Sequence, residues 1–262
     1  MSLGPGESGT SVVAVKDLGI SRGSVGSHAF ECSDGRTYFV KFKDATRTVV
    51  NEYVGYSLAR SFALPVPENG KVIVPQQLID GSAELSKRGV VGGLHHGTVW
   101  MEGCEDFRGK AIHELSLSNA ATLPGLIVLD NLLVNMDRNN PGNNLVQTTA
   151  KGLEYKTVDF SEILSGRNWT VETVEATKNA RYLVPVFPVI ALSVKSLSSF
   201  SPWLEQVEGV SEVELVQILS GIPEDWQMTD VEREAILDFI ITRKAMVREI
   251  LLSNRARFLN WR

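Results

Sequence analysis

The chain has 262 residues, of which 43% are hydrophobic and 22% charged, and its formal net charge is −5 at pH 7. These proportions are typical of a globular protein with a buried core, and they exclude a fibrous or disordered chain. The small acidic excess offers no clustered basic face, so we expect no nucleic-acid partner. Cys32 and Cys104 lie far apart and outside any CxxC motif, which excludes a disulfide scaffold and a zinc ribbon.

The sequence lacks the usual signals of a membrane-spanning or exported chain. No apolar run approaches the roughly 18 residues of a membrane span, and the longest candidate, residues 183–194, contains two prolines. Residues 1–10 have no basic segment followed by an apolar core, and we interpret them as a flexible leader. We therefore expect a cytoplasmic protein without a membrane partner.

Residues 12–42 predict short β-strands. Several β-branched residues follow position 12, and Asp34-Gly35 is typical of a two-residue hairpin turn. Side chains alternate between residues 38 and 43, so Lys41 and Lys43 share one face of this strand. One of these two lysines is expected to lie against a sheet surface.

The next segments complete a small unit of mixed structure. Apolar residues recur with helical spacing over residues 47–63, and the sequence Leu-Pro-Val-Pro that follows predicts the end of this helix. Residues 72–74 and 98–101 predict short strands, whereas residues 80–97 are rich in glycine and predict a loop.

The remainder of the chain is mainly helical in pattern. Residues 115–135 predict a largely apolar helix, residues 135–144 a polar loop, and residues 155–160 a strand. Beyond residue 172 the chain predicts helices, including a long one that opens at a capping box beginning at Thr229 and continues to about residue 250.

The fold class expected from this order of elements is α+β, with two lobes. We predict a leader over residues 1–10, a β-rich N-terminal lobe over 11–103 and a larger, mainly helical C-terminal lobe over 104–262. The sequence shows no internal repeat.

Two features of the N-terminal part have the residue types that bind phosphate. Gly23 and Gly26 lie in a turn between two predicted strands, where backbone amides can approach an anion without interference from Cβ atoms. Lys41 lies in a strand and Glu52 in the following helix, an arrangement that can hold an ammonium group near phosphates. Each feature alone has an ordinary alternative, a hairpin turn and a surface ion pair respectively.

Two features of the C-terminal part have the residue types that position a hydroxyl and a metal ion. The loop at residues 135–146 contains Asp137, which can orient or deprotonate an attacking hydroxyl, and Asn144, which can offer a neutral oxygen to magnesium. Asp159 stands at the end of an apolar strand, where its carboxylate can face Mg²⁺. An asparagine-rich turn and a helix cap are the ordinary alternatives.

The order of these features is more specific than any one of them. A glycine-rich turn, a strand lysine, a helix glutamate, a loop with aspartate and asparagine, and a strand-end aspartate are together the parts of phosphoryl transfer in kinases. The segments YFVKFK, NEYVGYSLARSFALPVPE, VLDNLLVNMDRNNPGNNLV and YKTVDFSEIL resemble the HipA-like kinases and, more distantly, the phosphoinositide kinases. The resemblance spans roughly residues 12–164.

This resemblance implies a two-lobed, protein-kinase-like fold that uses ATP and Mg²⁺. Asp137 would be the catalytic aspartate, Lys41 would contact the phosphates with Glu52 holding it, and Asp159 and Asn144 would bind the metal. Lys43 is the alternative to Lys41, and Asn143 the alternative to Asn144. The remaining nucleotide contacts would come from the glycine-rich turn and the segment between the lobes, namely Gly23, Ser24, Gly26, Ser27, Met101, Glu102 and Gly103.

Three departures from the family pattern bear on activity. Asp137 and Asn144 are seven residues apart where the usual catalytic loop has five, Asn139 replaces a common histidine, and Ser161 replaces the glycine of a DFG-type motif. The family implies an ATP-dependent kinase with a hydroxyl acceptor, a protein serine or threonine. A catalytically impaired pseudokinase that binds nucleotide or protein is the alternative.

Overall fold

The N-terminal part of the chain folds into a closed five-stranded barrel. The structure is a computed structural model that describes residues 11–23, 26–107 and 116–262. The strand order around the barrel is β1-β2-β3-β5-β4, in which β1 and β4 are parallel and the other neighbours antiparallel. The strands are β1 (Val12–Arg22), β2 (Ser27–Cys32), β3 (Thr37–Lys41), β4 (Asn69–Val74) and β5 (Gly93–Val99).

Alternate residues of the strands fill the barrel. Tyr38, Val40 and Phe42 are buried, as their shared face in the sequence pattern predicts. Helices α2 (Gln76–Gly81) and α3 (Ala83–Lys87) contribute Ile79 and Leu85 to the same core. The prediction of a loop over residues 80–97 is therefore wrong, because this segment contains α3 and most of β5.

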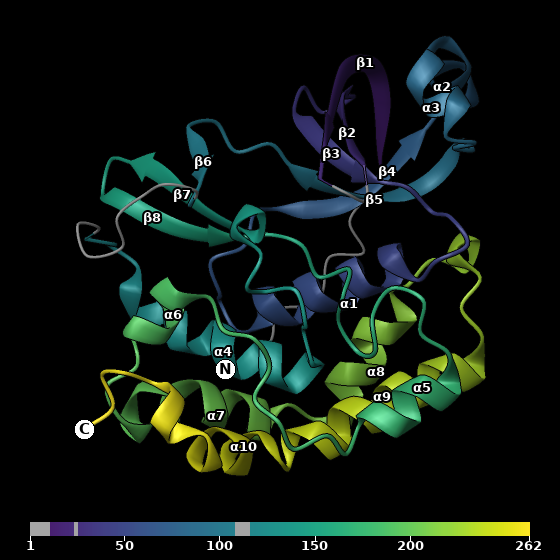
Figure 1. Ribbon diagram of the computed structural model, residues 1–262. Helices are drawn as coiled ribbons and strands as arrows, with labels where there is room; N and C mark the ends of the chain where they lie inside the picture. Colours follow the sequence, from purple (N-terminus) through teal and green to yellow (C-terminus); the bar gives the residue numbers. More distant parts are fainter. Residues whose placement is uncertain (1–10, 24–25, 108–115) are drawn as a thin grey trace.

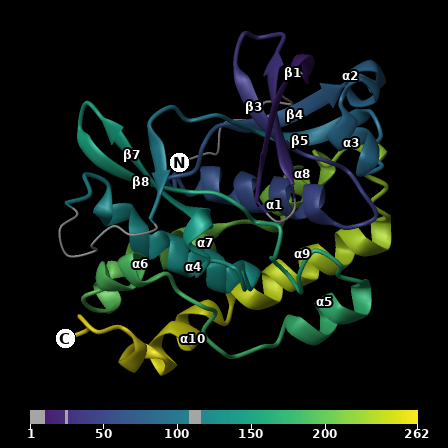
Figure 2. The same ribbon diagram turned by 45° about the horizontal axis from the view of Figure 1, so that its top comes forward.

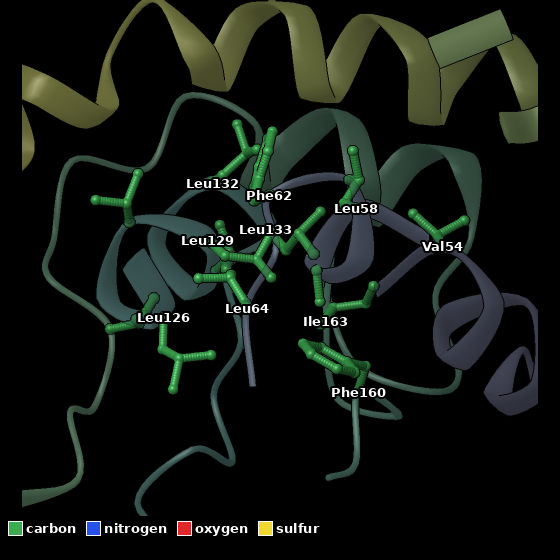
Figure 3. Close-up of a cluster of buried hydrophobic side chains, with 14 of the residues drawn as sticks. Val54, Leu58, Phe62, Leu64, Leu126, Leu129, Leu132, Leu133, Phe160 and Ile163 are labelled. Atoms are coloured by element: carbon green, nitrogen blue, oxygen red, sulfur yellow. The ribbon is translucent and has the colours of Figure 1, made fainter. Parts of the chain in front are cut away.

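A second and larger core contains the helices, including the one that lies in the N-terminal half of the sequence. Helix α1 (Thr48–Ser61) packs beside α4 (Leu123–Leu133), and Figure 3 shows Leu58 of α1 and Phe62, which follows this helix, in one cluster with Leu129, Leu132 and Leu133 of α4. Ala63, just after α1, has a positive φ of 52°, which turns the chain away from the helix.

A small antiparallel sheet and a set of helices complete the structure. The sheet has the order β6-β7-β8, and in both views α4, α5, α6, α7, α9 and α10 lie on the side of α1 away from the barrel (Figures 1 and 2). These elements are β6 (Cys104–Asp106), β7 (Asn144–Thr149), β8 (Gly152–Thr157), α5 (Val171–Thr177), α6 (Pro188–Leu192), α7 (Ser201–Gly209), α8 (Glu212–Ser220), α9 (Asp230–Lys244) and α10 (Val247–Ser253).

Most predicted elements occur, with shifted ends. The capping box at Thr229 opens α9 as expected, but the helix is interrupted after Lys244 and α10 follows as a separate helix. The predicted strand 155–160 ends at Thr157, so Asp159 lies beyond it in a loop. Across the residues described here, no helix is both long and apolar enough to cross a membrane.

Candidate active site

A cavity of about 1240 Å³ lies between the barrel and the helical part and collects most of the predicted site residues. Its walls come from the barrel, from the segment that follows β5, and from the loops that flank β7 and β8. Of the predicted residues it is lined by Gly23, Ser27, Lys41, Glu52, Met101, Gly103, Asp137 and Asp159, together with the alternative Asn143. The volume exceeds the roughly 300–1,000 Å³ typical of pockets for a single small ligand.

Lys41 lies between two carboxylates at the back of this cavity. Its Nζ is 2.5 Å from Oε1 of Glu52 and 2.7 Å from Oδ1 of Asp159. The Glu52 side chain is only 1% exposed, and the same oxygen accepts a hydrogen bond from the backbone N–H of Phe160. Lys41 of the barrel is thus held by one carboxylate from α1 and one from the segment after β8.

Lys43 lies apart from this cluster. It follows the end of β3, and its Nζ donates to the backbone carbonyl of Asp225 at 2.9 Å. The structure therefore brings Lys41, and not Lys43, to Glu52 and Asp159.

The cluster shifts the pKa values of all three groups. Burial opposes the charged form of each, but the charge and hydrogen bond of Lys41 bring the pKa of Asp159 well below its ordinary value. For Glu52, burial dominates over Lys41 and raises its pKa to about 7. The two carboxylates together keep the pKa of Lys41 above its ordinary value despite burial. Lys41 is therefore charged at neutral pH.

Asp159 has one occupied and one free carboxylate oxygen. Its Oδ1 accepts hydrogen bonds from Lys41, from the backbone N–H of Ser161 at 3.0 Å and from the hydroxyl of Ser161 at 2.6 Å. Its Oδ2 accepts none from any residue that the structure describes. Asp159 also has a positive φ of 69°, a left-handed conformation that is unusual for a residue other than glycine.

The segment after Asp159 is tied to helix α1 by one asparagine. The Nδ2 of Asn51 donates to the carbonyl of Ser161 at 2.7 Å, and its Oδ1 accepts from the indole N–H of Trp169 at 2.8 Å. Asn51 is fully buried and precedes Glu52 in α1. Helix α1 therefore holds both Lys41 and the backbone that carries Asp159.

The loop around Asp137 presents a second free carboxylate oxygen. Oδ2 of Asp137 accepts from Nδ2 of Asn143 at 2.8 Å and from Nδ2 of Asn140 at 3.2 Å, whereas Oδ1 has no hydrogen-bond partner among residues of known placement. The extra length of the loop is taken up by a short 3₁₀ turn, Pro141–Asn143. The side-chain oxygen of Asn140 accepts a hydrogen bond from the backbone N–H of Gly142 in this turn.

Asn143 and Asn144 point in different directions. Asn143 lines the cavity and donates through its amide nitrogen, whereas its Oδ1 accepts no hydrogen bond from the part of the chain that the structure describes. Asn144 is fully buried: its Nδ2 donates to the carbonyls of Arg138 and Asn140, and its Oδ1 accepts from the hydroxyl of Tyr155. The expectation that Asn144 faces a metal does not fit this packing, because both ends of its amide are already bonded away from the cavity.

Sequence reasoning missed the role of Arg138. This arginine is 1% exposed and donates to Asp130 of α4, to Thr157 of β8, and to the carbonyls of Val158 and Asn143. It thereby joins the loop of Asp137 to the segment of Asp159. The available signal was Asp130, a carboxylate in an otherwise apolar helix, since a buried charge needs a partner.

Only some of the residues predicted to contact the nucleotide line the cavity. Gly23 and Ser27 line it, Ser24 lies outside the described residues, and the carbonyl of Gly26 accepts from Arg88 at 2.7 Å. Met101 and Gly103 also line it, whereas Glu102 does not and instead accepts from Gln147 through its carbonyl at 3.0 Å.

The oxygens in the cavity suit magnesium together with a phosphate ligand. Where side chains are placed, no group of three or more His, Cys, Asp or Glu could hold a metal by itself. Mg²⁺ commonly uses one or two protein carboxylates and completes its octahedron with water and substrate phosphates. Among the described residues, the carboxylate oxygen Oδ2 of Asp159 and the amide oxygen Oδ1 of Asn143 accept no hydrogen bond, and both residues line the cavity.

Comparison with solved structures shows a fold shared with a bacterial kinase. The Helicobacter pylori proinflammatory kinase CtkA superposes with a TM-score of 0.58 at 13% identity, over 95% of this chain and 99% of that one. The Golgi casein kinase with Mn/ADP bound gives 0.49 at 11% identity, over 93% and 73% of the chains. HipA of Shewanella oneidensis, in complex with HipB and operator DNA, gives 0.42 at 12% identity, over 94% and 67%.

Comparison of the sequence identifies the family. None of the curated proteins matches the chain. The profile of the HipA-like kinase matches residues 15–160, which is more than half of the chain and includes Lys41, Glu52, Asp137 and Asp159. The chain belongs to the HipA-like kinase family.

Proposed function

We propose that this protein is a kinase that transfers the γ-phosphate of ATP to a hydroxyl acceptor, a serine or threonine of a protein. The observation that carries the proposal is the convergence of Lys41, Asp137 and Asp159 in one cavity, each carboxylate with one free oxygen. The barrel and the helical part would be the two lobes of a kinase, with their boundary after Gly103.

The barrel side of the cavity would hold the nucleotide. Lys41 supplies a buried positive charge for the phosphates, and Glu52 restricts its position. The backbone of the turn at Gly23 and Ser27 would approach the phosphates, and backbone groups of Met101 and Gly103 would bind the adenine.

The opposite side would hold the metal through Asp159 and Asn143. A bound Mg²⁺ would neutralise charge that develops on the transferred phosphate. We assign the second ligand to Asn143 and give Asn144 a structural role, because Oδ1 of Asn144 is bonded to Tyr155, whereas Oδ1 of Asn143 has no partner among the described residues. Ser24, Gly26 and Glu102 stay as neighbouring residues of the nucleotide site without an assigned contact.

Asp137 would position the acceptor hydroxyl. Asn140 and Asn143 hold one oxygen of its carboxylate, which leaves Oδ1 to accept the proton of the hydroxyl as it attacks the γ-phosphate. Phosphoryl transfer needs little covalent chemistry from the protein, so the main contribution of these residues is orientation and charge neutralisation.

A pseudokinase is the second candidate function, because the loop between Asp137 and Asn143 is longer than usual. The test is a thermal-shift titration with ATP and Mg²⁺, joined to an assay for transfer of labelled γ-phosphate to the protein itself and to serine-containing peptides. A ligand at 100 times its Kd stabilises the folded state by about 2.7 kcal/mol, which gives a measurable shift.

The kinase proposal predicts both a shift and transfer in the wild type, and loss of both in Asp159→Ala. The exposed Asp225 is a matched control, since its carboxylate has no hydrogen bond among the described residues and Asp225→Ala leaves the cavity unchanged. A shift without transfer identifies a pseudokinase. Absence of both shift and transfer contradicts the kinase proposal and leaves a pseudokinase that binds protein.

A further inference from the structure

Ser161 occupies the position where the DFG-type motif has glycine, and its side chain contacts Asp159. Its hydroxyl donates to Oδ1 of Asp159 at 2.6 Å, and its backbone N–H donates to the same oxygen at 3.0 Å. The hydroxyl distance is within the range of a charge-assisted hydrogen bond. Ser161 is 2% exposed, so water does not compete freely for either group.

The three donors to Asp159 all use the same oxygen. Lys41 shares Oδ1 with both groups of Ser161, Oδ2 has no partner among the described residues, and Asp159 lines the cavity. If Lys41 moves toward nucleotide phosphates, its contact with Oδ1 weakens, and Ser161 then provides the remaining bonds that fix the carboxylate plane.

We propose that Ser161 is a positioning residue that orients Asp159 so that Oδ2 is presented to a divalent cation. This inference rests on the proposed function, because it assumes that Asp159 binds the metal. A glycine at position 161 would supply the backbone N–H alone. The serine hydroxyl adds a second bond and so orients the ligand in the way that groups adjacent to metal ligands commonly do.

The fold around Ser161 does not depend on its hydroxyl. The carbonyl of Ser161 is held by Asn51 at 2.7 Å, and the neighbouring Phe160 is anchored by its N–H bond to Glu52 and by a fully buried ring. Ser161→Ala removes one oxygen atom and retains these contacts. We therefore expect this variant to fold with an unchanged cavity.

The experiment measures metal binding without turnover. Mg²⁺ is titrated into the protein saturated with the non-hydrolysable analogue adenylyl imidodiphosphate, and the midpoint is read from calorimetry and from the thermal shift. We expect Ser161→Ala to raise this midpoint by about 10–100-fold, which is the usual effect of removing a group that orients a metal ligand. Ser161→Thr, which retains a hydroxyl, should recover most of the affinity.

Controls separate this role from a general loss of stability. The melting temperature without metal, and the affinity for the analogue in EDTA, should be the same in Ser161→Ala and the wild type. Ser165→Ala is the matched substitution in the same segment, since within the described residues the hydroxyl of Ser165 is bonded to Thr173 and not to Asp159. Its Mg²⁺ midpoint should equal that of the wild type.

The outcomes distinguish this inference from the proposed function. An unchanged Mg²⁺ midpoint in Ser161→Ala overturns the positioning role and leaves the kinase proposal intact. A wild type that binds no Mg²⁺ in the presence of the analogue overturns the proposed metal site, and the positioning role with it. A raised midpoint in Ser161→Ala with recovery in Ser161→Thr supports the inference.

Discussion

Adjacent residues can have opposite roles when a turn directs one side chain into a cavity and the next into the core. Asn143 and Asn144 are such a pair, because Asn143 ends the 3₁₀ turn after Pro141 whereas Asn144 begins β7. Sequence spacing limits the second metal ligand to one of these two residues. It could not separate them, since the direction of each side chain depends on the turn and not on distance from Asp137.

Asn143→Ala should lower phosphoryl transfer and leave the protein folded. It removes a proposed metal ligand and the bond that orients Asp137, so we expect a fall of about 100-fold or more in kcat/KM. Asn144→Ala should instead destabilise the protein by about 1–3 kcal/mol, because the buried hydroxyl of Tyr155 and two carbonyls lose their partner. Assays of transfer and urea unfolding of both variants check this, and the reverse pattern would restore Asn144 as the ligand.

Lys41 and Lys43 form a second matched pair. Lys41→Met removes the buried positive charge between Glu52 and Asp159, and we expect transfer to fall by about 10²–10³-fold. Lys43→Met loses only a bond to a backbone carbonyl at a partly exposed site, so nucleotide affinity and transfer should stay near wild type. Equal losses in both variants would argue against Lys41 as the phosphate contact.

Strand alternation placed both lysines on one face, and only the end of β3 after Lys41 distinguishes them.

At the scale of elements, strand β5 shows why glycine content misled the sequence prediction. A Cβ atom on Gly97 would lie 2.5 Å from the side chain of Val72 in the neighbouring strand β4. Glycine is therefore present because the barrel interior leaves no room for a side chain, and not because the segment forms a loop. Helix α1 and strand β3 were predictable because their apolar spacing reflects their buried faces.

The two histidines of β5 predict a pH dependence of stability. Burial lowers the pKa of His95 to about 4 and that of His96 to about 3. Between pH 6.5 and 4 the unfolded chain binds protons at both positions and the folded chain does not. Their contribution is therefore complete above pH 6.5 and falls by up to about 1.4 kcal/mol per pH unit for each histidine as the pH decreases.

The contribution of the two histidines to stability is measured by comparing the wild type with a variant that lacks both. Glu52 acts in the opposite direction, because its raised pKa of about 7 makes the folded chain bind a proton that the unfolded chain lacks between pH 7 and 4.5. The comparison is therefore wild type against the double variant His95→Asn, His96→Phe, by urea unfolding at pH 7 and pH 5. The wild type should lose more stability than the variant, and equal losses would contradict the assignment.

For the whole molecule, sequence composition anticipated a β-rich part and a helical part, but not where the boundary between their cores lies. Helix α1 falls inside the predicted N-terminal lobe, yet its buried side chains belong to the larger core with α4. The reason is that α1 is buried on several faces, so its apolar spacing predicts a helix but does not show which element packs against it. Tertiary packing decides which elements contact such a helix, and the spacing of its apolar residues does not predict them.

The position of α1 predicts that Lys41 helps to hold the barrel against the larger core. Spin labels at Lys87→Cys on α3 and Glu234→Cys on α9, in a Cys104→Ser background, would report the distance between the two parts. We expect Lys41→Met to broaden this distance distribution, because it removes the ion pairs that join the barrel to Glu52 and Asp159. An unchanged distance distribution in Lys41→Met would contradict this role.

Asn51 gives the molecule a further property. Because it fastens α1 to the segment from Ser161 to Trp169, the elements that carry Glu52 and Asp159 are hydrogen-bonded to each other. Lys41 comes from the barrel, so the geometry of the three charged groups depends on the distance between the barrel and this pair of carboxylates. Under the proposed function, we expect a ligand that shifts the barrel to change the rate of phosphoryl transfer through this distance.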